Sequence, residues 1–337
     1  RDILIYEVVL ELYTDIGTDC FDNRIRNFEY YSVRWPHEVG VLIRLPRLKI
    51  IMTSLEDQLS NLDVENVFIY VADAVREDYL PESIAVKGIT ATGIASSTYS
   101  PPSFSSIVSG VYPPNHGVHW FSHQLPHPPV FDVESVNTYY HSTMYGMEGT
   151  SDSFFRVFDL SSDRHHSVVS DCEPPFIAIE RGNGGHAPYR NELSAPEYFR
   201  KYAGESTATI RSHYRNRISE DTDNFESRIE ALAERDLLED TLVIYTSDHG
   251  ELLGEGGQLG HNAPMRPELV YVPFVFSHPE LSTALDVDGV IRHVDLLPTV
   301  LDLLDADTSD SKRFDGHSLS TQSPADSGLT FFQRQFF

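Results

Sequence analysis

The fold of this chain follows from the stretch Val67–Asp73, which reads VFIYVAD. An apolar run made almost entirely of β-branched and aromatic residues leads directly into a carboxylate. Such an unbroken run predicts a strand buried on both faces, as in a parallel sheet. Because open parallel sheets bind ligands at the carboxyl ends of their strands, Asp73 is a candidate binding residue.

The stretch Leu242–His249 repeats this pattern and reads LVIYTSDH. Its apolar run predicts a second buried strand, and Asp248 and His249 follow directly. Neighbouring strands in a sheet lie only about 5 Å apart, so these two side chains and Asp73 can meet at one edge. Apolar runs at residues 176–179 and 270–276 predict further strands. Helical patterns lie between the strands, so the predicted fold class is α/β with a mostly parallel, doubly wound sheet.

A third segment, residues 98–110, reads TYSPPSFSSIVSG and predicts a loop that becomes a short helix. Pro101 and Pro102 suit the first helical positions, and Gly110 suits the end. The Ser100 hydroxyl would then lie at the helix N-terminus, where free N–H groups and the helix dipole stabilise an anionic ester. The alternative is that Ser100 only caps the helix.

Together these side chains predict a metal site with mixed oxygen and nitrogen ligands. Asp73, Asp248, His249 and Ser100 offer two carboxylates, an imidazole and a hydroxyl. A divalent ion there would lower the pKa of the Ser100 hydroxyl and polarise an ester oxygen. Each aspartate alone is better explained as a strand-end cap, but the combination favours a site.

With these residues identified, the sequence resembles the sulfatase branch of the alkaline phosphatase superfamily. The matching motifs follow the family order from about residue 66 to residue 319. They comprise the first metal motif at 71–76, the nucleophile motif at 100–104, its helix end at 109–110, a turn at 112–118, the central histidine loop at His186, the second metal motif at 246–251 and a helix start at 293–299.

The resemblance implies an alkaline-phosphatase-like three-layer sandwich, a divalent metal, and a covalent intermediate in hydrolysis or transfer of a phosphate or sulfate ester. It also implies roles for individual residues. Ser100 would be the nucleophile and a metal ligand. The other implied metal ligands are Asp73, Asp248 and His249. The residues implied to contact the substrate or protonate the leaving group are His186 and His261.

This sequence departs from the family pattern at several positions. Ala74 stands where many sulfatases have a second aspartate, and His249 stands where many have asparagine. Fewer carboxylates and an added imidazole favour manganese or zinc, with calcium possible. Gly182 and Asn183 occupy the region where true phosphatases carry an acid for a second metal, so we expect one ion.

The core-motif arginine is replaced by Phe104. In sulfatases that arginine supports the aldehyde formed from the nucleophilic cysteine or serine. We therefore expect an unmodified Ser100, which attacks phosphorus more readily than sulfur.

These residues predict a metal-dependent hydrolase of phosphate or sulfate esters that acts through Ser100. Two alternatives are a phosphotransferase that passes a phosphoryl or phosphoglycerol-type group to an alcohol, and a metal-binding or carbohydrate-binding relative without turnover. The expected substrate is a small-molecule, carbohydrate or lipid ester.

The charge of the chain excludes one class of partner. Its 51 acidic residues against 25 basic ones give a net charge of −26. Nucleic-acid binding needs a basic face, so no nucleic-acid partner is expected. The acids are dispersed, which is typical of a halophile-like protein that stays dissolved in strong salt. An acidic surface for a cationic partner is the alternative.

The predicted organisation has three parts. Residues 1–62 form an appendage that packs on the core, residues 63–320 form the sulfatase-like catalytic domain, and residues 321–337 form a tail. No apolar run is long enough to span a membrane. Acidic residues interrupt the first apolar stretch, which fits a signal peptide poorly, and we expect a cytoplasmic location.

Stability should depend on salt, because excess negative charge repels itself when screening is weak. The screening length is about 30 Å at 0.01 M salt and about 3 Å at 1 M. We expect the melting temperature to rise from dilute buffer to molar KCl. Thermal melts across a KCl series measure this, and a flat series would contradict the halophile interpretation.

Overall fold

The computed structural model describes residues 29–35, 38–44, 54–125, 128–144, 152–160, 168–190, 193–261, 263–307 and 314–332. The chain divides into two units, residues 1–52 and 53–337. In the first unit, β1 (Glu29–Trp35) and β2 (Glu38–Arg44) form an antiparallel hairpin. The expected domain boundaries at residues 62 and 320 stay a prediction.

The second unit is built on a seven-stranded sheet of described residues, in the order β11-β4-β10-β7-β3-β6-β5. Only β10 runs antiparallel to its neighbours, so the predicted mostly parallel sheet is confirmed. The strands are β3 (Asn66–Ala72), β4 (Ile89–Ile94), β5 (Asn137–Ser142), β6 (Phe176–Gly182), β7 (Thr241–Thr246), β10 (Tyr271–Ser277) and β11 (Ile291–Arg292). A separate ribbon pairs β8 (Leu252–Leu253) with β9 (Leu259–Gly260).

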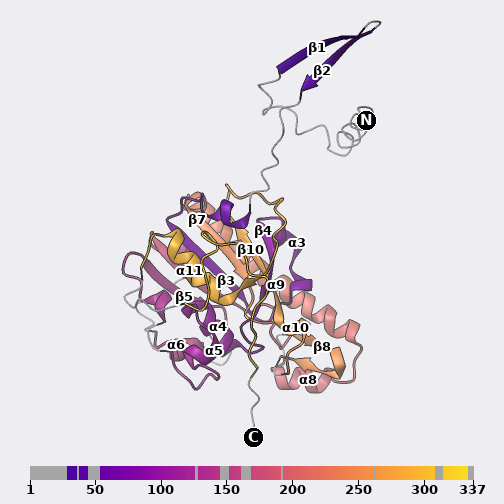
Figure 1. Cartoon of the computed structure of the whole chain (residues 1–337). Helices are drawn as coiled ribbons and strands as arrows, with labels where there is room; N and C mark the ends of the chain where they lie inside the picture. Colours follow the sequence, from indigo (N-terminus) through magenta and orange to yellow (C-terminus); the bar gives the residue numbers. More distant parts are fainter. Residues whose placement is uncertain are drawn as a thin grey trace. The chain divides into compact units, whose positions relative to one another are not determined.

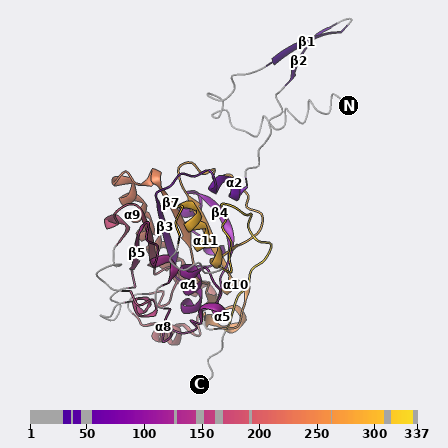
Figure 2. The same ribbon diagram turned by 60° about the vertical axis from the view of Figure 1, so that its left-hand side comes forward.

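Helices cover both faces of this sheet (Figures 1 and 2). The α-helices are α2 (Leu55–Leu59), α3 (Glu82–Ala85), α4 (Ser100–Ser109), α5 (Pro113–His116), α6 (Ser153–Val157), α8 (Ala195–Tyr202), α9 (Thr207–Glu234), α10 (Pro267–Val270) and α11 (His293–Leu303). The 3₁₀ turns are η2 (Glu77–Tyr79), η3 (Pro129–Phe131), η4 (Val169–Asp171), η5 (Leu238–Asp240) and η6 (Glu255–Gly257). Helices α4 and α11 lie on one face and α9 on the other, which gives three layers.

Successive side chains of the central strands point to opposite faces of the sheet, which explains this layering. In β3, Val67, Ile69 and Val71 enter the core shared with α4 and α11. The residues between them, Phe68 and Tyr70, enter the core shared with α9. Because both faces are covered, every residue of β3 is buried. The continuous apolar run in the sequence is the consequence of this burial.

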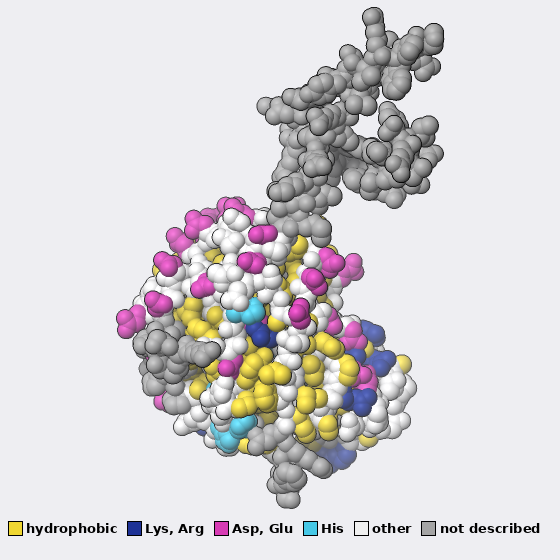
Figure 3. Space-filling model, viewed as in Figure 1, with side chains coloured by type: hydrophobic (Ala, Val, Ile, Leu, Met, Phe, Trp, Pro, Cys, Tyr) yellow, Lys and Arg dark blue, Asp and Glu magenta, His cyan; other side chains and the backbone are white. Residues whose placement is uncertain are grey.

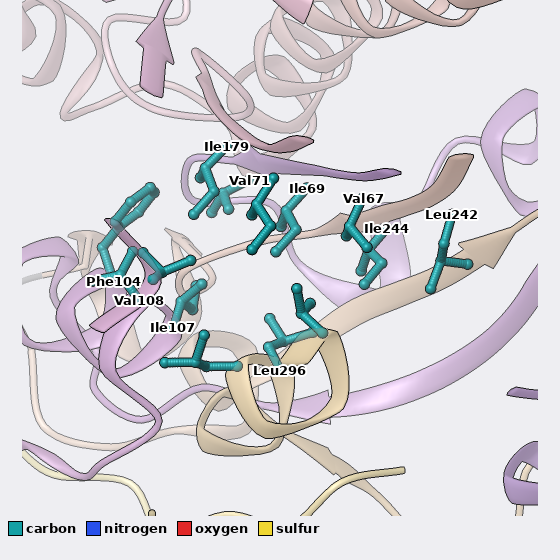
Figure 4. Packing of buried hydrophobic residues seen from close by; sticks show 14 of the residues in the cluster. Val67, Ile69, Val71, Phe104, Ile107, Val108, Ile179, Leu242, Ile244 and Leu296 are labelled. Carbon is teal, nitrogen blue, oxygen red and sulfur yellow. The ribbon is translucent and has the colours of Figure 1, made fainter. Parts of the chain in front are cut away.

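The face toward α4 is a dense aliphatic and aromatic core (Figure 4). Side chains of the central strands point toward Phe104 and Ile107 of α4 and toward Leu296 of α11. Phe104 is fully buried, with its ring centroid 4.6 Å from that of Phe154. An arginine at position 104 would bury a charge among aromatic rings, which is costly without a partner.

Helix α4 begins and ends as predicted, with one correction at its start. Tyr99 is the N-cap, and Ser100 is the first helical residue, followed by the two prolines. Ser100 therefore does not cap this helix. Gly110 ends it in the left-handed conformation, with φ of 70°.

The described surface carries many acidic side chains that are not gathered in one block. Figure 3 shows them spread over the upper part of one face of residues 53–337. Across the described residues, no helix is both long and apolar enough to cross a membrane.

Candidate active site

The two central strands bring the predicted metal ligands together. Strands β3 and β7 pair in parallel with Val71 opposite Thr246, so Asp73 and Asp248 follow the paired ends. One potential ligand atom from each of Asp73, Asp248 and His249 lies within 4.8 Å of the others. All three side chains are completely buried.

The oxygen atoms of this cluster fit a cation. Oδ1 of Asp248 accepts hydrogen bonds from the backbone N–H groups of Ala74, at 3.1 Å, and His249, at 3.0 Å. One oxygen of Asp73 is taken by Arg181. The remaining oxygens, Asp73 Oδ1 and Asp248 Oδ2, are buried without a hydrogen-bond partner. Buried carboxylate oxygens need a compensating charge, and a divalent ion would supply it.

The two carboxylates differ in their electrostatic environment. Burial would raise the pKa of Asp73, but the Arg181 guanidinium and the nearby histidines together outweigh burial and hold that pKa well below its usual range. Burial and the charge of Asp73 raise the pKa of Asp248 to about 7. Two adjacent buried carboxylates resist joint ionisation unless a cation binds between them.

His249 presents a free lone pair to Ser100. Its Nδ1 lies 2.8 Å from the carbonyl oxygen of Gly250, which can only accept, so Nδ1 carries the hydrogen. Its Nε2 is therefore the unprotonated nitrogen, 3.0 Å from Ser100 Oγ. Burial, together with nearby His261, lowers the pKa of His249 to about 3, so the ring is neutral.

A second contact fixes the start of α4 against the Asp248 segment. The Ser103 hydroxyl donates to the backbone oxygen of Asp248 at 2.5 Å. Nδ1 of His293 accepts from the backbone N–H of Ser96 at 3.2 Å, and its Nε2 donates to the Ser247 carbonyl at 2.9 Å. These bonds hold Ser100 in register with the carboxylates.

His261 is oriented by a buried acid and points at the other histidines. Its Nδ1 lies 2.7 Å from Glu251 Oε2, and the Tyr189 hydroxyl donates to the other Glu251 oxygen at 2.5 Å. Burial alone would lower the pKa of His261, but Glu251 raises it and the net shift is upward. Its ring centroid lies 4.3 Å from that of His249 and 5.3 Å from that of His186.

His186 lies on a glycine-rich loop that packs onto the backbone of Asp73. The Asp73 N–H donates to the Gly182 carbonyl at 3.3 Å, and the Gly185 N–H donates to the Asp73 carbonyl at 2.8 Å. The backbone N–H groups of residues 183 and 184 face buried Asp221 of α9 and oppose the rise that burial causes in its pKa. The loop is thus held by Asp73 on one side and faces Asp221 on the other.

The structure therefore brings all six residues predicted for the site into one cluster. Sequence reasoning missed three residues around it: Arg181, Glu251 and Asp221. Arg181 had a detectable signal, because Glu180 and Arg181 are charged residues directly after the apolar run at 176–179. Strand β6 continues through both of them to Gly182, and both are buried. Asp221 lies on an acid-rich helix and had no such signal.

The chain is similar to known sulfatases and sulfatase-related proteins. The family model described as Sulfatase matches residues 170–306. The low-salt glycan biosynthesis sulfotransferase Agl7 of Haloferax volcanii is 37% identical over 246 residues, which are 70% of this chain and 60% of that protein. Human arylsulfatase K is 32% identical over 189 residues, which are 53% of this chain and 30% of that protein. The chain thus spans less than two thirds of either relative.

Among solved structures, the phosphonate monoester hydrolase of Silicibacter pomeroyi has the same fold. The TM-score is 0.57 at 15% identity, and the match covers 78% of each chain.

Gly184 offers a test of the packed loop. Its φ is +49°, and a Cβ there would lie 2.1 Å from the Asp73 carbonyl oxygen. Gly117 also has a positive φ, +74°, but has open space around it. We expect Gly117→Ala to lower the free energy of unfolding by about 1 kcal/mol through backbone strain alone. Gly184→Ala should cost at least about twice as much, because the Asp73 backbone must also move.

Urea denaturation of both variants measures these losses. Mn²⁺ titration of Gly184→Ala should also show weaker binding than Gly117→Ala. Equal losses of stability and equal Mn²⁺ affinity in the two variants would contradict the packed-loop interpretation.

Proposed function

Because this chain belongs to the sulfatase and alkaline-phosphatase-like superfamily, we propose that it is a metal-dependent enzyme that cleaves sulfate or phosphate esters through a covalent intermediate on Ser100. One observation carries the proposal. The Ser100 hydroxyl lies 3.0 Å from the free nitrogen of His249, beside two buried carboxylate oxygens that have no partner.

The residues that would hold the metal are Asp73, Asp248, His249 and Ser100. Their donor set, two carboxylates with one imidazole and one hydroxyl, suits manganese or zinc better than calcium. When bound, the ion would act as a Lewis acid on the ester and lower the pKa of an oxygen nucleophile.

Ser100 has the placement expected of a nucleophile. It is the first residue of α4, where the free N–H groups and the helix dipole stabilise an anionic ester group. Its hydroxyl oxygen lies 3.0 Å from Nε2 of His249. A bound metal ion would take the single lone pair of that nitrogen, so the ion rather than the imidazole would lower the pKa of the Ser100 hydroxyl. The helix start is fixed by Ser103, so the attacking oxygen is held in position.

His261 is the group best placed to protonate the leaving oxygen. Glu251 holds its Nδ1 hydrogen and stabilises the charged ring, which leaves Nε2 as the second proton-bearing nitrogen. His186 is half-buried beside it, and its Nδ1 is held by the Ala187 carbonyl at 2.6 Å. Its other nitrogen is therefore available to contact the ester group.

The acceptor of the transferred group is water in a hydrolase and an alcohol in a transferase. The name of the Haloferax relative, a sulfotransferase of glycan biosynthesis, favours transfer to an alcohol as a second candidate function. Both reactions use the same covalent intermediate and differ only in the attacking oxygen.

An aromatic rim beside the histidines suits a sugar or aryl substrate. Tyr99 precedes Ser100, and its ring stacks on that of His261 with centroids 6.4 Å apart. Half-buried Trp120 follows, 5.7 Å from Tyr99. The choice between sulfate and phosphate depends on Ser100. An unmodified serine favours attack on phosphorus. A sulfate ester formed on that serine would have no aldehyde hydrate in the side chain through which the sulfate could be released by elimination.

Replacing the nucleophile should separate metal binding from turnover. We expect Ser100→Ala to lower turnover by on the order of 10³-fold or more while retaining the metal, since the carboxylates and His249 remain. Assays with aryl phosphate and aryl sulfate, with and without Mn²⁺, and metal analysis of the variant measure both properties. Mass spectrometry of the peptide spanning residues 90–120 should show an unmodified serine. Turnover close to wild type in Ser100→Ala would exclude this mechanism.

Removing a carboxylate should remove the metal. We expect Asp248→Ala to lose both bound Mn²⁺ and activity, because the remaining ligands, Asp73, His249 and Ser100, include only one carboxylate and would hold a divalent ion weakly. The matched control is Asp302→Ala, which removes an exposed carboxylate on α11. Metal analysis and ester assays on both purified variants decide the outcome. An Asp248→Ala protein with full metal occupancy would refute the assigned ligand.

A further inference from the structure

We propose that Arg181 is a positioning residue for the metal site, whose guanidinium holds one oxygen of Asp73 so that the other is presented to the metal ion. This inference rests on the proposed function, because it concerns an implied metal ligand. Arg181 belongs to none of the motifs that pointed to the site.

The position of Arg181 follows from the register of the sheet. It is the sixth residue of β6, opposite Val71 of β3 and Ser142 of β5. Its side chain is only 5% exposed. A buried guanidinium needs compensating negative charge, so its partners are decisive. Nη1 and Nη2 have carboxylate partners, whereas Nε has no hydrogen-bond partner.

Those partners are two carboxylates on opposite sides of the guanidinium. Nη2 donates to Asp73 Oδ2. Nη1 lies 3.3 and 3.2 Å from the two oxygens of Asp152. The ring of Phe154 lies under the plane, 4.9 Å from the guanidinium carbon to the ring centroid. The planar fork of arginine can span both acids, whereas the single ammonium of lysine cannot.

Asp152 is itself held by two further hydrogen bonds, so it can serve as the anchor. It is the N-cap of α6, and its Oδ1 accepts from the Phe154 N–H at 3.0 Å. Its Oδ2 accepts from the Tyr140 hydroxyl at 3.1 Å. The chain of contacts therefore runs from α6 through Arg181 to Asp73, and Asp73 Oδ1 is left without a partner.

The charges explain why this arrangement favours metal binding. The positive charge of Arg181 and the negative charge of Asp152 cancel, so the pair orients Asp73 without changing the net charge of the site. The two negative charges of Asp73 and Asp248 then balance the two positive charges of one divalent ion. Mutation of a residue that hydrogen-bonds to a metal ligand commonly lowers metal affinity or activity by about 10-fold to 100-fold.

The test compares buried Arg181 with half-buried Arg228 of α9, whose partner Glu180 directly precedes Arg181 in β6. Arg228 binds Glu180 with two donors, Nε at 2.9 Å and Nη2 at 3.0 Å, one residue before Arg181. We expect Arg181→Lys to weaken Mn²⁺ binding by about 10-fold to 100-fold in calorimetric titration. Arg228→Lys should change Mn²⁺ affinity by less than about twofold, although it also breaks a carboxylate pair.

Asp152→Asn is the second variant, for the case that Arg181→Lys does not fold. Asparagine keeps the helix cap to Phe154 but removes the charge that anchors Arg181, since Asn and Asp cap helices equally well. We expect it to weaken Mn²⁺ binding in the same direction. Circular dichroism and melting temperatures verify that each variant is folded.

Three outcomes are distinguishable. Weaker Mn²⁺ binding in Arg181→Lys and Asp152→Asn, but not in Arg228→Lys, supports the positioning role. Unchanged or tighter binding in the first two variants overturns it and leaves the proposed function intact. Wild-type protein that binds no Mn²⁺, Zn²⁺ or Ca²⁺ overturns the metal-dependent function and this inference together.

Discussion

The parallel pairing of β3 with β7 is the constraint on which the site depends. It places Asp73 and Asp248 side by side at one edge of the sheet, with both side chains completely buried. Two adjacent carboxylates repel each other in a low-dielectric interior, and each keeps one oxygen without a hydrogen-bond partner. A cation between them resolves both costs. The surrounding contacts can be understood as support for that arrangement.

That support comes from every layer of the sandwich. Helix α4 delivers Ser100 on one face and is tied to the Asp248 backbone by Ser103. Helix α9, on the other face, delivers Asp221 to the loop that carries His186. The site is thus built from segments that are far apart in sequence, and each is held by buried hydrogen bonds rather than by flexible loops.

The absence of an arginine at position 104 has a structural explanation. Phe104 packs into an aromatic cluster with Phe154, and the other side of that cluster carries the guanidinium of Arg181. A buried cation near Asp73 is therefore supplied from β6 rather than from α4. This arrangement is consistent with the proposed chemistry on an unmodified serine.

The sequence by itself determined the α/β class and the buried strands, and it indicated the six residues of the candidate site. Four of them had local signals: apolar runs that end in Asp73 and in Asp248 with His249, and prolines that open a helix at Ser100. The roles of His186 and His261 followed from the resemblance to the sulfatase branch. Only the tertiary structure decided the roles of Arg181, Glu251 and Asp221, and the tautomer of His249. Their partners lie on other strands and helices. A local pattern can reveal that a strand is buried, but the pairing of a buried charge depends on which distant side chain the fold brings to it.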